Sequence, residues 1–212
     1  MAKIPSRNAE IAALGVRVVT IWANHPTLDL GWITQTDAVT LTTNYDSIIL
    51  QTSQTAGSER VKAQTMRVLD ETIDSNLTYL KQLIGIEYGK NASFTHYASF
   101  GIKKENGGYV IPRDRDDRIE ALRLMVSELA TAPFSGSTYG LAFWQNILTQ
   151  YEAAKDDLES ETVKLSGDVT DKSKLRNEVL KLLKSMKYLI MANYPDTYDR
   201  ALRDFGYLDE YV

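Results

Sequence analysis

Apolar residues recur at helical spacing along most of the chain. The first stripe, with steps of three and four residues, consists of Ile11, Leu14, Val18, Ile21 and Trp22. Ser6 is a candidate cap for this helix, and Pro26 predicts that the helix ends just after His25. A connector of residues 26–33 follows, and we expect its larger apolar side chains to pack on the helices; these are Leu28, Leu30 and Trp32.

A second helical stretch begins near Thr34 or Thr36, and Thr34 and Asp37 resemble a capping box. Its apolar positions are Leu41, Tyr45, Ile48 and Ile49, followed after a gap by Met66, Leu69, Ile73, Leu77, Leu80 and Ile84. The gap, residues 51–60, holds small polar residues and Gly57, which costs about 1 kcal/mol relative to alanine in a helix. Either a turn at residues 56–58 joins two helices, or one helix runs from 34 to 84. Because the gap lacks proline and paired glycines, we favour one long helix, with Gly57 as the site of a kink.

The pattern changes over residues 85–112. Short β-favouring pieces lie on either side of Asn106, Gly107 and Gly108, and these three residues supply the positive φ angles that tight hairpin turns require. We expect a small hairpin or an extended excursion at one end of a helical bundle.

Helical spacing returns after Pro112. A helix from about residue 114 to 130 has four inward positions, Ile119, Leu122, Val126 and Leu129. A helix from 138 to 165 carries the cleanest heptad, Trp144, Ile147, Tyr151, Ala154, Leu158, Glu161 and Leu165, and we expect Ser166, Gly167 and Asp168 to end it. A third helix carries Leu175, Val179, Leu182, Met186 and Leu189 and ends at residues 193–196. Residues 197–206 form a short last helix, closed by Gly206.

The chain is therefore predicted to be all-α: an antiparallel bundle of long helices with a small irregular or β-hairpin insertion near residues 85–112. We expect a single helical-bundle domain over residues 1–212.

Composition narrows the class of protein. The 212 residues include no cysteine, which excludes disulfides, a thiol nucleophile and cysteine metal sites. No apolar stretch approaches the roughly 20 residues that span a bilayer, so we expect a soluble protein with no membrane span. The first ten residues lack the apolar run of a signal peptide. The default expectation is a cytoplasmic location, with leaderless export left open.

Charge argues against a nucleic-acid partner. The formal net charge is −4, whereas nucleic-acid binders tend to be strongly basic. The densest basic positions are Lys172, Lys174, Arg176, Lys181, Lys184 and Lys187. They alternate with apolar residues, which is typical of the solvated face of an amphipathic helix.

Few residues carry candidate chemistry. His25 and His96 each lack a second histidine at the four-residue spacing of a helical metal site, and no Glu-x-x-His motif of a di-iron bundle occurs. Asp114, Asp116 and Asp117 form an acidic cluster, which we attribute to the preference of negative side chains for the first turn of a helix. We expect no catalytic residue, no metal site and no cofactor.

Glu161 interrupts a core position of the heptad. A buried carboxylate would need a partner and would indicate register control or a site. Because Glu161 lies near the end of its predicted helix, we expect it to be exposed instead.

Aromatic residues gather toward the C-terminus, where tyrosine suits half-buried surfaces and interfaces. The candidate interaction surface consists of Tyr194, Tyr198, Phe205, Tyr207, Leu208 and Tyr211. The last residues are apolar enough that we expect them to pack on their own bundle or on a neighbouring subunit.

The stretch from Ala192 to Val212 resembles the ending of a group of uncharacterised bacterial helical-bundle proteins. The matching residues are Leu202, Arg203, Phe205 and Gly206, with Tyr207 in place of the usual phenylalanine. The resemblance covers about 20 residues. It implies a bundle of long helices and no known activity.

We weigh three functions. The first is a non-enzymatic structural or protein-interaction protein that forms a homo-oligomer or binds a protein partner. The alternative is a bundle that binds a small molecule, or an enzyme of unrecognised type, with Tyr151, His96 and the cluster at Asp114 as candidate residues. The third, nucleic-acid binding through the basic positions between Lys172 and Lys187, is disfavoured by the net charge.

Overall fold

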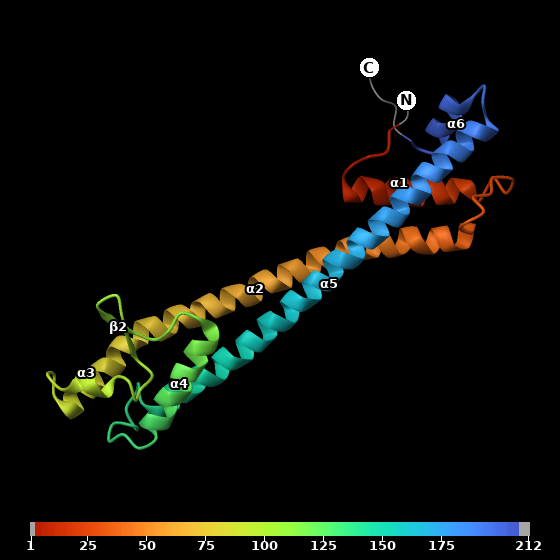
Figure 1. Ribbon diagram of the computed structural model, residues 1–212. Helices are drawn as coiled ribbons and strands as arrows, with labels where there is room; N and C mark the ends of the chain where they lie inside the picture. The colour runs from red at the N-terminus through yellow and green to blue at the C-terminus, as the bar shows by residue number, and fades with distance from the viewer. Residues whose placement is uncertain (1–2, 208–212) are drawn as a thin grey trace. The chain divides into compact units, whose positions relative to one another are not determined.

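The computed structural model describes residues 3–207 and confirms an all-α bundle with a small hairpin (Figure 1). The elements in chain order are α1 (Asn8–Trp22), α2 (Gln35–Tyr88), α3 (Ser93–His96), β1 (Lys103–Glu105), β2 (Gly108–Val110), α4 (Arg115–Leu129), α5 (Leu141–Asn193) and α6 (Tyr198–Asp204). The two longest helices, α2 and α5, have 54 and 53 residues.

The chain divides into two compact units. Unit 1 comprises residues 1–57 and 163–212, and unit 2 comprises residues 58–162. Each of the two long helices therefore contributes one end to each unit. The expectation of a single domain over residues 1–212 stays a prediction.

Unit 1 packs α1, the first part of α2, the last part of α5 and α6 around one hydrophobic core. Its helices approach closely at Gly15, where an added Cβ atom would lie 3.0 Å from Thr42 and 3.3 Å from Val179. The buried Trp22 indole donates a hydrogen bond of 2.7 Å to the Leu28 carbonyl, which holds the connector after α1 on this core.

Unit 2 has a second core, formed by the last part of α2, the segment from α3 to β2, α4 and the first part of α5. Strands β1 and β2 pair antiparallel, with Lys104 opposite Tyr109. Asn106 and Gly107 both have positive φ angles, 48° and 80°, as the predicted tight turn requires. Gly101 approaches α4 so closely that a Cβ atom there would overlap the Ala121 carbonyl group.

Helices α2 and α5 run antiparallel within each unit. In unit 2, the Tyr151 hydroxyl donates to the Asp70 carboxylate at 2.9 Å, and the Lys62 ammonium contacts Glu161 at 2.9 Å. Lys62 precedes Asp70 on α2, whereas its partner Glu161 follows Tyr151 on α5, so the two helices run in opposite directions. In unit 1, the Thr55 hydroxyl donates to the Asp168 carboxylate at 2.7 Å.

The prediction of one long helix over 34–84 is confirmed, since α2 continues through Gly57. Its start is also as predicted: the Asp37 amide donates to the Thr34 hydroxyl oxygen at 3.1 Å. The Thr34 hydroxyl in turn donates to the Asp37 carboxylate at 2.7 Å. This carboxylate therefore replaces the backbone contact that a glutamate makes in the usual capping box.

The predicted helix end at residues 166–168 is wrong, because α5 continues from Leu141 to Asn193. Asp168 is 7% exposed and accepts hydrogen bonds from the side chains of Gln51 and Thr55 on α2. Its carboxylate is thus engaged across the helix pair, where it does not compete for local backbone amides as a helix-ending aspartate does.

Two expectations near the N-terminus also need correction. Helix α1 begins at Asn8 with Arg7 at the N-cap position and no side-chain cap, so Ser6 is not the cap. Helix α1 ends at Trp22 rather than after His25, since the next residues tighten into a turn in which the Asn24 amide donates to the Ile21 carbonyl.

The connector packs only in part. Leu28 is buried, but Trp32 is 42% exposed, with the Lys181 ammonium 4.0 Å from its ring centroid. A cation above an indole is favourable at an exposed site, which explains why this ring lies outside the core.

Candidate functional site

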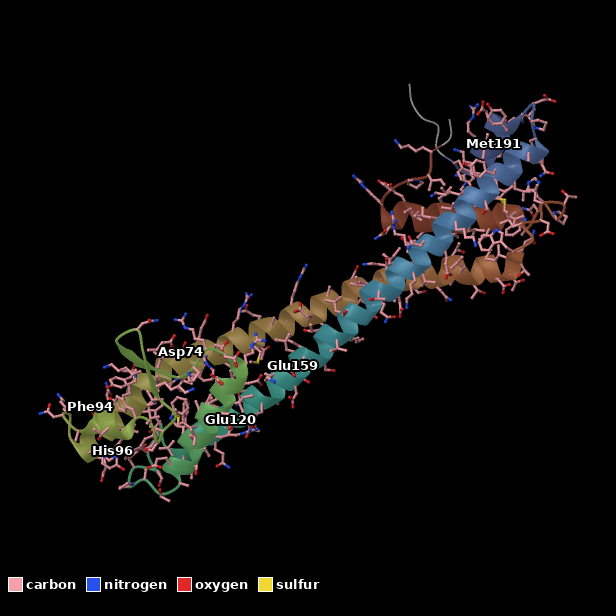
Figure 2. All side chains as sticks on the ribbon, viewed as in Figure 1. Asp74, Phe94, His96, Glu120, Glu159 and Met191 are labelled. Atoms are coloured by element: carbon pink, nitrogen blue, oxygen red, sulfur yellow. The ribbon has the colours of Figure 1, made fainter. Side chains whose placement is uncertain are left out.

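A buried polar network joins three helices in unit 2. Arg118 of α4 is 2% exposed, and its Nε donates to the Pro112 carbonyl at 2.6 Å. Its Nη1 donates to Asp70 at 2.7 Å and its Nη2 to Asp74 at 3.2 Å, both on α2 (Figure 2 labels Asp74). A buried guanidinium requires an acceptor for its N–H donors, since an unpaired charge would be costly to desolvate.

Tyr151 of α5 completes this network. Its side chain is fully buried, and its hydroxyl donates to the same Asp70 oxygen that Arg118 contacts. Burial, together with the hydrogen bond to Asp70, raises the pKa of the Tyr151 hydroxyl well above its ordinary value. The hydroxyl therefore stays protonated and donates its hydrogen bond to Asp70. The network holds α4 against α2 and α5.

An open groove lies between α2 and α5 in unit 2. Its volume is about 620 Å³. The lining residues on α2 are Val61, Lys62, Gln64, Thr65, Val68 and Leu69, and those on α5 are Gln150, Ala153, Ala154 and Asp157. Val61 is 67% exposed and Val68 49%, so both expose apolar surface to solvent.

The groove and α4 lie on opposite faces of the helix pair. At 3.6 residues per turn, the seven-residue spacing of Val61 and Val68 puts them on one side of α2. Asp70, which contacts Arg118 of α4, is two positions beyond Val68 and hence roughly 200° further around α2. On α5, the residue that marks the side facing α4 is Lys155, whose ammonium lies 2.9 Å from Asp116 of α4.

Lys155 is likewise two positions beyond Ala153, which lines the groove. Both helices thus turn one face to α4 and the opposite face to the groove. The same Lys155 ammonium also lies 2.7 Å from Glu159 of α5, which Figure 2 labels, so this cation is paired on the face that α5 turns to α4.

The expectation that Glu161 is exposed is wrong. Its side chain is 12% exposed and lies 2.9 Å from the Lys62 ammonium, at the edge of the groove. The hydrogen bond from Lys62 to Glu161 is the main cause that raises the pKa of Lys62. Because α5 continues far beyond residue 165, Glu161 is in the middle of a paired helix rather than at a frayed end.

The acidic cluster at the start of α4 is divided among different partners. The Asp114 carboxylate accepts hydrogen bonds from the amides of Asp116 and Asp117, as an N-cap residue does. Asp116 pairs with Lys155, and Asp117 lies 3.8 Å from Lys103. Across residues 3–207, no three His, Asp or Glu side chains are arranged to hold a metal ion.

The two histidines lie in separate units. His25, in unit 1, packs its ring 5.2 Å from that of Phe205, and its Nδ1 is 3.5 Å from the Tyr194 hydroxyl. His96, at the end of α3 in unit 2, stacks on Tyr88 with ring centroids 3.8 Å apart. Among the described residues, His96, Tyr151 and Asp114 do not contact one another: His96 stacks on Tyr88, Tyr151 donates to Asp70, and Asp114 caps α4.

Some residues of the predicted aromatic interaction surface are buried. Phe205 and Tyr207 are each 2% exposed within the core of unit 1, and the Tyr207 hydroxyl donates to the Leu183 carbonyl at 2.7 Å. These two side chains are therefore not available to a partner in this structure. Tyr194 and Tyr198 are half-buried, while Leu208 and Tyr211 lie outside the described residues. Recognition through the half-buried tyrosines stays a prediction.

The basic positions on α5 are largely on its outer side. Lys174, Lys181 and Lys184 are exposed, as expected for the wet face of an amphipathic helix. Arg176 instead reaches α1, where its Nε donates to the Asn8 side chain at 3.1 Å. Within the described part of the chain, each helix is too short or too polar to traverse a bilayer.

Tyr151 of the network is among the candidate residues predicted from the sequence, whereas Arg118 of the network and Val61 and Val68 of the groove are not, although signals for these three exist. Arg118 occupies a buried stripe of α4 with Leu122 and Met125, so a charged residue interrupts an apolar row. Val61 and Val68 form a second apolar row on α2, seven residues apart, beside the stripe that contains Met66.

Comparison with known proteins gives no further identification: no family model, no curated protein and no solved structure matches this chain. The resemblance of the C-terminal residues to a bacterial group therefore remains an expectation.

Proposed function

We propose that this chain is a non-enzymatic interaction protein whose unit 2 accepts an α-helix of a protein partner in the groove between α2 and α5. The observation that carries the proposal is the groove itself, an elongated surface with an apolar floor on the face opposite α4. Helix-in-groove recognition uses anchors spaced along a helix and a hydrophobic channel to receive them.

The groove has the dimensions of such a channel. The lining residues Val61 to Leu69 extend for about 12 Å along α2, which is roughly two helical turns. The α5 residues 150–157 line the opposite side at steps of three and four. A helix lying in this channel would add a fourth helix to the three already packed in this unit, as in a four-helix bundle.

The chemistry of the lining supports the same function. Val68, Leu69 and Ala153 provide apolar surface, and Thr65 and Ala154 are small enough to allow close approach of a second backbone. Gln64 and Gln150 add polar groups to the same lining. Apolar contacts combined with polar groups are usual in a protein interface.

The test compares two arginine substitutions on the same helix. Val68→Arg places a charge in the groove, and Val39→Arg changes an exposed valine of similar exposure, 46%, in unit 1. Affinity-tagged wild type and both variants are used to isolate bound proteins, which mass spectrometry then quantifies. We expect one partner to be retained by wild type and Val39→Arg, and its recovery to fall at least tenfold with Val68→Arg.

Native mass spectrometry of the same samples addresses the alternative function. The groove volume also falls within the range of small-molecule pockets, roughly 300–1,000 Å³. A discrete small-molecule adduct on wild type and Val39→Arg that is missing from Val68→Arg would favour the alternative and contradict the proposal.

A further inference from the structure

We infer that the protein partner is a second copy of the same chain and that it packs its own α2 and α5, rather than a single helix, on this groove, an inference that rests on the proposed function. In the proposed dimer, a two-fold axis runs parallel to α2 and α5 of unit 2. Each α2 then lies against the α5 of the other copy, and the two helix pairs form a four-helix bundle in which every neighbour is antiparallel.

The sizes of the lining side chains are self-complementary. The α2 side of the groove presents the larger apolar residues, Val61, Val68 and Leu69, and the α5 side presents Ala153 and Ala154. An axis parallel to the helices places the valine row of one copy over the alanine row of the other. A two-fold axis perpendicular to the two helices would place valine on valine and alanine on alanine. The valines would then be crowded, and a void would lie between the alanines.

The register of the helix pair brings these rows to the same height. Asp70 of α2 contacts Tyr151 of α5. Val68 is two residues before Asp70, and Ala153 is two residues after Tyr151 on the antiparallel helix, so the two stand level. Rotation about a parallel axis preserves height, and Val68 therefore faces Ala153 of the second copy.

Charge favours the same arrangement. Lys62 lines the groove on α2 and Asp157 lines it on α5. In the register that levels Val68 with Ala153, they stand within two residues of the same height, about 3 Å apart along the helix pair, and the Lys62 ammonium lies 3.4 Å from the Asp157 carbonyl oxygen of its own chain. In the parallel-axis dimer, each Lys62 faces the exposed Asp157 of the second copy, giving two symmetric pairs of opposite charge. The perpendicular axis would instead set each α2 against the other α2, so Lys62 would not face Asp157.

The absence of cysteine from the sequence allows a direct test. Two full-length single-cysteine variants, Val68→Cys and Ala153→Cys, are prepared separately, mixed and oxidised. With one thiol in each chain, any disulfide joins two copies. We expect a covalent dimer with the mass of one chain of each variant to predominate by at least tenfold over dimers formed from either variant alone.

The control mixture contains Val39→Cys in place of Val68→Cys and should give only background cross-linking, because position 39 lies outside the groove. Sedimentation velocity provides a second measurement without cysteine. We expect wild type to dimerise reversibly and Val68→Arg to raise the dimer dissociation constant by about 100-fold, roughly tenfold for each of two symmetric sites. Val39→Arg should leave the constant unchanged.

Two results would overturn the inference. A predominant dimer of Val68→Cys with itself would show that the helices meet about the perpendicular axis. Wild type that stays monomeric at all concentrations, with no mixed disulfide, would show that the occupant is not this chain. In that second case, a different partner lost only by Val68→Arg would preserve the proposed function, whereas unchanged recovery of every bound protein would overturn that function as well.

Discussion

Removal of the Arg118 guanidinium should destabilise unit 2 more than any other charge deletion in α4. Arg118→Ala removes the donor to the Pro112 carbonyl and to Asp74 and leaves Asp70 with only the Tyr151 hydroxyl. Breaking a fully buried ion pair costs about 3–5 kcal/mol. Here the Asp70 side chain is 33% exposed and that of Asp74 57%, so solvent can replace part of the lost interaction. We therefore expect the free energy of unfolding to fall by about 2–3 kcal/mol.

The assay is urea unfolding followed by far-UV circular dichroism, with stability obtained by linear extrapolation. Arg115→Ala is the matched control, since Arg115 lies in the first turn of the same helix and is only partly buried. A cation near the positive end of a helix dipole is slightly unfavourable, so this control should change stability by no more than about 0.5 kcal/mol. Asp74→Asn should cost less than about 1 kcal/mol, because Asp74 is the more exposed acceptor.

A loss for Arg118→Ala below about 1 kcal/mol, or one equal to that of Asp74→Asn, would refute the reasoning, since it would mean that the buried guanidinium behaves like a surface charge. The variant Tyr151→Phe separates the two donors to Asp70. It should lower stability by about 1 kcal/mol, the contribution of one hydrogen bond, while the larger loss remains specific to Arg118.

Four further substitutions test the backbone and the C-terminal packing, each by the same urea titration. Gly57→Ala and Gly167→Ala should each raise the free energy of unfolding by up to about 1 kcal/mol, because both glycines lie inside helices with open space around them; a loss at Gly167 would contradict the continuity of α5. Gly101→Ala should lower stability by about 2 kcal/mol or more, since φ is 71° and α4 leaves no room for a methyl group; an unchanged value would show that the hairpin stem shifts freely. Tyr207→Phe should cost about 1 kcal/mol through the lost hydrogen bond to the Leu183 carbonyl, and a neutral result would mean that this bond contributes nothing net.

Local features of the fold could be read from the sequence, because they depend on residues close together in the chain. The apolar stripe from Met66 to Ile84 predicts the second half of α2. Thr34 with Asp37 predicts its start, and Asn106 with Gly107 predicts the hairpin turn. In each of these cases the stabilising contact spans at most a few residues.

Other features depend on residues far apart in the chain. Ser166, Gly167 and Asp168 have the composition of a helix end, yet α5 continues because Asp168 finds two donors on α2, 117 and 113 residues away. Glu161 is paired rather than exposed because Lys62 lies across from it. No local pattern contains these partners.

The candidate site illustrates the same division. Helical spacing along the chain is enough to place apolar rows on α2 and α5, with an alanine pair and two valines among them. Which rows are covered depends on the packing of the helices: the Arg118 network holds α4 on one face of the helix pair, and the row of Val61 and Val68 remains open on the other. The physical reason is that helical periodicity arises from adjacent residues, whereas burial depends on which other element packs against each face.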